Sequence, residues 1–230
     1  MNGWPITTIC GLLGLLCGSL ATHAIHRWPR EVVRTGPRVD TLVQLLVAVV
    51  WALTAFVHGP VWELPALLAV GWAVVVATVI DLELRIIPNK LTYRLAPTVL
   101  VLLIGAALLD GSWGDLRRAV LVGLALPGGM LLLSEAFRLM RGQPGMGMGD
   151  IKLAVSLGLA LGYLGGWEVV IGIYASVIAA VVFAFGLMAA GRAGLASRIP
   201  FGPYLALGTL VAVLVGGPLS GALRGWLGLA

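Results

Sequence analysis

The sequence predicts an all-α polytopic membrane protein with about eight transmembrane helices. Of its 230 residues, 60% are hydrophobic and only 11% are charged, and the mean hydropathy is +1.02. A soluble helical domain needs a polar outer face on every helix, and this composition does not supply one. Apolar runs of bilayer length, separated by charged residues, glycine and proline, mark the individual spans.

Eight apolar runs follow one another along the chain, at 5–25, 41–58, 62–80, 95–109, 119–137, 150–165, 168–191 and 203–222. The run 150–165 would rise only about 24 Å as a helix, less than the roughly 30 Å hydrocarbon core, so we expect local thinning or a wet vestibule there. The run 119–137 carries Pro127 and two glycines at its centre, which predicts a bend. No soluble domain or linker interrupts the series, which predicts a single transmembrane domain over 1–230.

The distribution of positive charge predicts the orientation. No Lys or Arg precedes the first run, and Arg27, Arg30, Arg34 and Arg38 follow it, which favours a retained helix over a cleaved signal peptide. If the region after this run is cytoplasmic, 12 of the 15 Lys and Arg fall on inner segments, at 26–40, 81–94, 138–152 and 192–202. We therefore expect both termini outside, and the net charge of +5 needs no nucleic-acid partner.

Two of the ten acidic residues stand out by position. Asp81 closes the third run and Asp150 opens the sixth, so both are expected at the inner membrane face. A carboxylate at membrane depth is costly and indicates function, although a helix-end charge or, for Asp150, an N-terminal cap is the simpler alternative. If the two carboxylates meet, they share a proton, and the pair can activate water while polarising a scissile carbonyl. The pattern is typical of an aspartic peptidase.

The residues that flank the aspartates suggest how these are positioned. Glycines alternate with methionines at 145–149, which predicts a hinge or a close approach of the backbone to a partner. Pro88 is expected to stop the third helix, and Asn89 either to cap the next helix or to contact substrate. Lys152 lies about 200° round a helix from Asp150, so we expect an interfacial anchor that points away from the aspartates.

Four stretches, in the expected order, resemble the prepilin peptidase family, also called type IV leader peptidases. Gly147-Met148-Gly149-Asp150 resembles the GxGD motif of that family, with Lys152 two residues on, and Asp81-Leu82 with Ile87-Pro88-Asn89 resembles its first catalytic aspartate motif. Gly18-Ser19-Leu20 with the stretch 25–29 is similar to the end of the family's first helix, and the stretch 199–204 to the start of its last helix. The resemblance implies that Asp81 and Asp150 are catalytic and that the other motif residues support them.

The resemblance also implies a substrate and a location. An endopeptidase of this family cleaves the basic leader from type IV prepilin-like or pseudopilin-like membrane proteins, at the cytoplasmic face of the bacterial inner membrane, and we expect no cofactor or metal. Bifunctional members carry a cysteine-rich zinc-binding insert after the first helix, whereas the segment 26–40 contains no cysteine, so N-methyl transfer is not expected. A GxGD peptidase of other specificity, and a non-enzymatic transporter or assembly scaffold, remain open alternatives, as does the oligomeric state.

Overall fold

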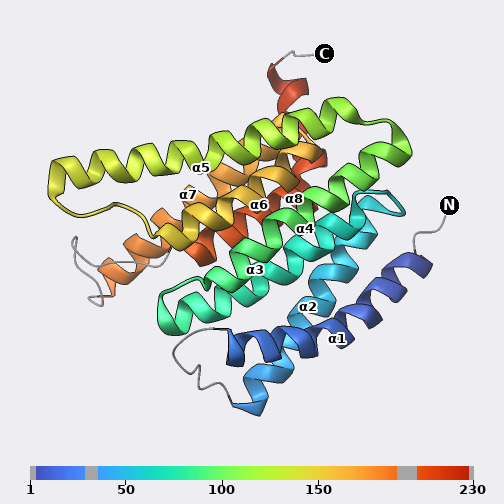
Figure 1. Ribbon diagram of the computed structural model, residues 1–230, viewed down its shortest axis with the longest axis horizontal. Helices are drawn as coiled ribbons and strands as arrows, with labels where there is room; N and C mark the ends of the chain where they lie inside the picture. Colours follow the sequence, from blue (N-terminus) through green and yellow to red (C-terminus); the bar gives the residue numbers. More distant parts are fainter. Residues whose placement is uncertain (1–3, 29–35, 191–200, 228–230) are drawn as a thin grey trace.

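The computed structural model describes residues 4–28, 36–190 and 201–227, and these form eight α-helices (Figure 1). Each predicted apolar run corresponds to one helix. The helices are α1 Trp4–Arg27, α2 Pro37–His58, α3 Leu64–Leu84, α4 Asn89–Asp110, α5 Trp113–Arg141, α6 Met148–Leu164, α7 Gly166–Ala189 and α8 Gly202–Leu227. Arg30, Arg34 and, from the motif stretches, Pro29 and Ile199-Pro200 lie outside the described residues.

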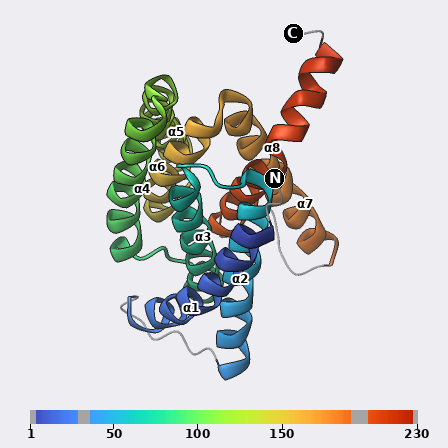
Figure 2. The same ribbon diagram turned by 90° about the vertical axis from the view of Figure 1, so that its right-hand side faces the viewer.

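Neighbouring helices pack as pairs around a central helix. Helix α1 packs against α2, α5 against α6 and α7 against α8, while α3 touches α1, α2, α4, α6 and α8 (Figures 1 and 2). Valine and alanine fill the interface of α3, where Val70, Val74 and Ala77 are fully buried. The end of α3 is therefore fixed from several sides, which matters because Asp81 lies in its last turn.

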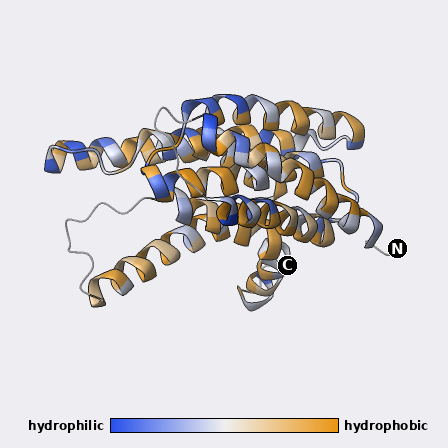
Figure 3. Cartoon of the chain, turned by 90° about the horizontal axis from the view of Figure 1, so that it is seen from below, coloured by the Kyte–Doolittle hydropathy of each residue, from blue (hydrophilic) through white to orange (hydrophobic). Residues whose placement is uncertain are grey.

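Seven of the eight helices are long and apolar enough to cross a membrane, and the exception in the described chain is α6. Hydrophobic residues predominate along the helices (Figure 3). Helix α6 has 17 residues and rises about 26 Å, which agrees with the expectation of a short sixth helix. It is enclosed by α3, α4, α5, α7 and α8, and most of its side chains are buried. The chain is a multi-pass membrane protein of the all-α class.

The predicted role of Pro88 as the end of the third helix was wrong. Helix α3 ends at Leu84, and Arg85 closes it in the left-handed conformation, with φ 54° and ψ 36°, while its N–H donates to the carbonyl of Asp81 at 2.9 Å. Pro88 instead precedes α4 as its N-cap, where a fixed φ of −64° suits the start of a helix. No side chain caps α4, because Asn89 is already its first helical residue. Helix α5 continues through Pro127, and the bend predicted there stays a prediction.

Candidate active site

Asp81 is buried at the carboxyl end of α3. Its side chain is only 4% exposed, and Gly202, the first residue of α8, lies directly against its carboxylate. Within the described part of the chain, its Oδ2 atom is buried and has no hydrogen-bond partner. Native structures rarely leave a buried acceptor unpaired, and the exceptions concentrate at sites of function. The position is therefore unlike that of a structural helix-end charge in the headgroups.

Asp150 lies in the first turn of α6, two residues after Met148 begins the helix, and it is 8% exposed. The N-cap is Gly147, so the alternative in which Asp150 caps the helix was wrong. Gly147 lies against the carboxylate of Asp150, since a Cβ atom there would be 3.2 Å from Oδ2, and a negative charge in the first turn also interacts favourably with the helix dipole. The start of α6 thus holds the carboxylate in one orientation.

The two aspartates face each other beside Gly202. A Cβ atom at Gly202 would lie 2.6 Å from Oδ2 of Asp81 and 3.3 Å from Oδ1 of Asp150. These two oxygens are consequently no farther apart than the two distances together, a separation at which two negative charges repel each other and disfavour ionisation of both groups. The sequence left open whether the aspartates meet, and the structure brings them together from α3 and α6, with the first turn of α8 against both.

Gly202 is the site residue to which sequence reasoning gave no role. It was noticed only as part of the stretch 199–204, at the start of the last helix. The signal in the sequence is a glycine directly before Pro203 at the start of a helix, where the absence of a side chain allows another group to come close. Only the folded arrangement shows that the excluded volume belongs to the two carboxylates.

Gly149 makes the close approach that the glycine-rich stretch predicted. A Cβ atom there would lie 2.9 Å from Cβ of Ile87 and 3.3 Å from its backbone nitrogen and oxygen, so α6 begins directly against the loop between α3 and α4. None of the glycines at 145–149 has a positive φ, whereas Gly142 does, at 73°. Gly149 therefore allows the start of α6 to pack closely against Ile87. The backbone conformation of the stretch gives no support to the predicted hinge.

Lys152 ties α6 to α4. Its Nζ donates to Oδ1 of Asn89 at 2.9 Å and lies 4.9 Å from the centre of the Tyr93 ring. The side chain is held by these partners on α4 and is not a free interfacial anchor, and its predicted direction away from the aspartates stays a prediction. Asn89 accepts this bond instead of capping α4, which corrects the capping prediction. The pair thus joins the start of α4 to the start of α6, the helix that carries Asp150.

An apolar groove is lined mainly by α5 and α7. It has a volume of about 470 Å³ and lies mainly between α5 and α7, which contribute Gly129, Met130 and Ser176 among others. Met146 and Phe201 also line it. These two residues immediately precede Gly147 and Gly202, which touch the carboxylates. The groove is therefore lined by chain neighbours of the candidate site, although neither aspartate lines it. Among the described residues, no group of three His, Cys, Asp or Glu is placed to hold a metal ion.

Comparison of the sequence with known proteins identifies its family. The chain matches the type IV leader peptidase family over residues 67–187. It is 35% identical over 181 residues to the prepilin leader peptidase/N-methyltransferase of Aeromonas salmonicida (strain A449), a region that covers 76% of this chain and 57% of that protein. The proteins of the same name from Stutzerimonas stutzeri and Pseudomonas aeruginosa are 32% and 30% identical over 179 residues, covering 76% of this chain and 58% of each relative. No solved structure matches the chain.

The matched region covers more than half of the chain and contains both Asp81 and Asp150. The chain spans little more than half the length of the relatives named above. The family resemblance drawn from the four motif stretches is confirmed. This protein belongs to the type IV leader peptidase family.

Proposed function

We propose that this protein is a membrane-embedded aspartic endopeptidase that removes the basic leader from type IV prepilin-like or pseudopilin-like precursors. The observation that carries the proposal is the pairing of two buried carboxylates, Asp81 and Asp150, around a glycine that leaves them room. We place the reaction at the cytoplasmic face of a bacterial inner membrane, with both termini on the opposite side. Relatives of this chain are named prepilin leader peptidase/N-methyltransferase, which agrees with the peptidase activity.

The chemistry requires one proton between the two carboxyl groups. The ionised carboxylate accepts a proton from a water molecule, and the resulting hydroxide adds to the scissile carbonyl carbon. The protonated partner donates a hydrogen bond to the carbonyl oxygen and stabilises the charge that forms on it. The C–N bond then breaks as the leaving nitrogen takes up a proton. Both aspartates lie at helix ends, where water from the membrane surface reaches them more readily than at mid-bilayer.

The groove between α5 and α7 is the proposed position for the apolar helix that follows the cleavage site in such precursors. Its lining is almost wholly apolar, and it includes Met146 and Phe201, the chain neighbours of Gly147 and Gly202 beside the carboxylates. Gly129 leaves open space toward neighbouring atoms, which allows a bulky helix to approach α5 closely. Methyl transfer is left out of the proposal, because the segment 26–40 has none of the cysteines of the zinc-binding insert.

Single substitutions of the aspartates test the proposal. Asp81→Asn and Asp150→Asn should each abolish cleavage of a purified pilin-like precursor, measured in single-turnover reactions, because the mechanism needs both carboxyl groups. A thermal unfolding scan should show both variants folded. Glu83→Gln is the matched control, since Glu83 is an exposed carboxylate two residues after Asp81, and it should retain normal cleavage. Normal processing by either aspartate variant would contradict the mechanism, and no cleavage by the unmodified protein would favour the transporter or scaffold alternative.

A further inference from the structure

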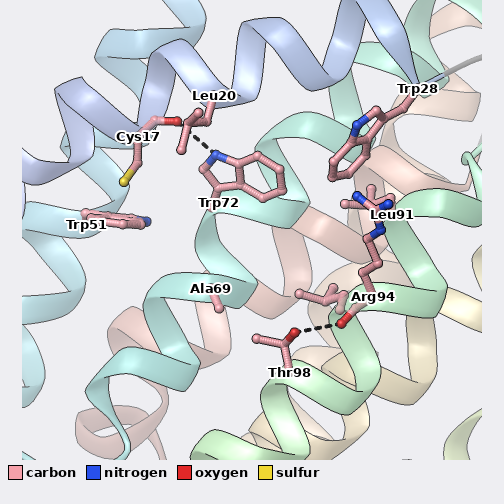
Figure 4. A pocket seen from close by; sticks show the side chains of 10 residues that line it. Cys17, Leu20, Trp28, Trp51, Ala69, Trp72, Leu91, Arg94 and Thr98 are labelled. Carbon is pink, nitrogen blue, oxygen red and sulfur yellow. Dashed lines mark hydrogen bonds between the residues drawn. The ribbon is translucent and has the colours of Figure 1, made fainter.

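A second apolar cavity, of about 260 Å³, lies between α1, α3 and α4 and shares no lining residue with the groove beside the aspartates. Its walls include three of the eight tryptophans in the sequence, Trp28, Trp51 and Trp72 (Figure 4). Cys17 and Leu20 of α1 complete one side, and Leu91, Leu95 and Thr98 of α4 the other. Nothing in the proposed peptidase reaction uses this cavity.

The tryptophan rings are held in place by their polar edges. Nε1 of Trp72 donates to the carbonyl of Cys17 at 3.0 Å, and Nε1 of Trp51 donates to the carbonyl of Leu68 at 2.9 Å. The rings of Trp28 and Trp72 meet edge to face, with centroids 5.9 Å apart. Because each indole N–H of Trp51 and Trp72 is satisfied by backbone, the rings present hydrocarbon to the cavity. The cavity is thus a preformed apolar site.

One charged side chain, Arg94, lines the cavity. Its guanidinium carbon lies 5.5 Å from the centre of the Trp28 ring, and no carboxylate in the described part of the chain pairs with it. Arg94 is in the second turn of α4, whose first residue is the Asn89 that binds Lys152 near the start of α6. The arginine therefore lies toward the same membrane face as the aspartates, at the depth where a long basic side chain reaches the lipid phosphates.

The cavity is elongated along the helices. Its lining on α1 runs from Cys17 to Trp28, about 16 Å of helix, and on α4 from Leu91 to Thr98, about 10 Å. Figure 4 shows Trp28 and Arg94 at one end, Cys17 and Trp51 at the other, and Trp72 between them. An apolar cavity of about 150 Å³ accepts benzene, so this one has room for a longer hydrocarbon segment. A chain lying in it would run roughly along the bilayer normal, as acyl chains do.

We propose that this cavity binds an anionic phospholipid, with one acyl chain between the tryptophans and the phosphate against Arg94. Charge complementarity selects this occupant, because an arginine with no carboxylate partner in the described chain attracts a phosphate and the rest of the lining attracts only hydrocarbon. The basic leader of the proposed substrate would instead be repelled by Arg94. The inference does not depend on peptidase activity.

Quenching of tryptophan fluorescence by brominated lipid tests the site directly. The protein is reconstituted in phosphatidylcholine vesicles that contain a small, equal share of either phosphatidylglycerol or phosphatidylcholine with dibrominated chains. The phosphatidylglycerol should quench more strongly than the phosphatidylcholine at the same mole fraction. Arg94→Gln should weaken this preference about fivefold. Lys90→Gln removes the same charge from the same helix end without touching the cavity, and it should leave the preference unchanged.

A second variant tests the acyl-chain half of the site. Ala69→Phe fills the cavity while leaving Arg94 in place, so the excess quenching should be lost although the charge remains. Native mass spectrometry of the unmodified protein should show one retained anionic lipid, which keeps the test valid if a variant fails to fold. Equal quenching by the two lipids, or an equal loss of the preference in the Lys90 and Arg94 variants, would overturn the proposal.

Discussion

Replacing Gly202 by alanine should reduce cleavage strongly without unfolding the protein. The added methyl carbon would lie 2.6 Å from Oδ2 of Asp81, 3.2 Å from its Cγ and 3.3 Å from Oδ1 of Asp150. No positive φ is found at Gly202, so alanine is compatible with the backbone and the clash alone decides the outcome. The substitution therefore acts on the geometry of the carboxylate pair.

The size of the effect follows from the displacement. Ordinary contact begins near 3.4 Å, so the Asp81 carboxylate and the start of α8 must separate by about 0.8 Å. A misplacement of about 1 Å in a catalytic group costs on the order of a hundredfold in rate, which corresponds to about 2.7 kcal/mol of activation free energy. The free energy of unfolding should change much less, because alanine favours the helix by up to about 1 kcal/mol over glycine and offsets part of the strain.

The assay is single-turnover cleavage of a pilin-like precursor alongside a thermal unfolding scan. Gly217→Ala is the matched control on the same helix, since a Cβ atom there meets nothing within 4 Å. The control should cleave at the normal rate. If Gly202→Ala also cleaved at the normal rate while remaining folded, the carboxylates would not need the space that this glycine leaves, and the reasoning from their geometry would be refuted.

Three further substitutions probe the surroundings of the site. Gly149→Ala should slow cleavage, because the new methyl group would lie 2.9 Å from a carbon of the loop after α3 and push α6 away from it; single-turnover rates check this. Lys152→Met should lower the free energy of unfolding by about 1 kcal/mol, and a double-mutant cycle with Asn89→Ala should show that the two effects are not additive. Gly129→Leu should raise KM for the precursor by filling the groove, whereas Gly128→Leu, which does not line it, should not.

Different outcomes would contradict these three predictions. A normal cleavage rate in Gly149→Ala would show that the start of α6 does not need its close contact with Ile87. Strict additivity in the cycle would mean that Lys152 and Asn89 do not interact in the membrane. An unchanged KM in Gly129→Leu would place the substrate elsewhere.

The number and order of helices were predictable because a bilayer imposes a length on every apolar run. The ends of the helices were less predictable. Helix α3 continues to Leu84, beyond the predicted end at 80, and stops through the left-handed Arg85 and not at the proline. A non-glycine residue in that conformation has no clear signature in a single sequence.

Within the candidate site, the aspartates could be chosen from the sequence because their motifs and positions at span ends agree. The contacts that set their geometry could not be chosen. The bond between Lys152 and Asn89 joins residues 63 positions apart, and Gly202 reaches the carboxylates only through the packing of α8 against α3 and α6. Such contacts depend on tertiary packing, for which local periodicity carries no information.

The position of Gly202 has a consequence during synthesis of the protein. A chain that emerges from the ribosome delivers α3 and α6, with both aspartates, before α8, the last of the described helices. Until α8 docks, the carboxylate of Asp81 lacks its neighbour Gly202, and the groove lacks the wall supplied by Phe201 and Leu205. Under the proposed function, a nascent chain is therefore an incomplete protease, and it would become competent to cut other membrane proteins only after its final described helix has been inserted.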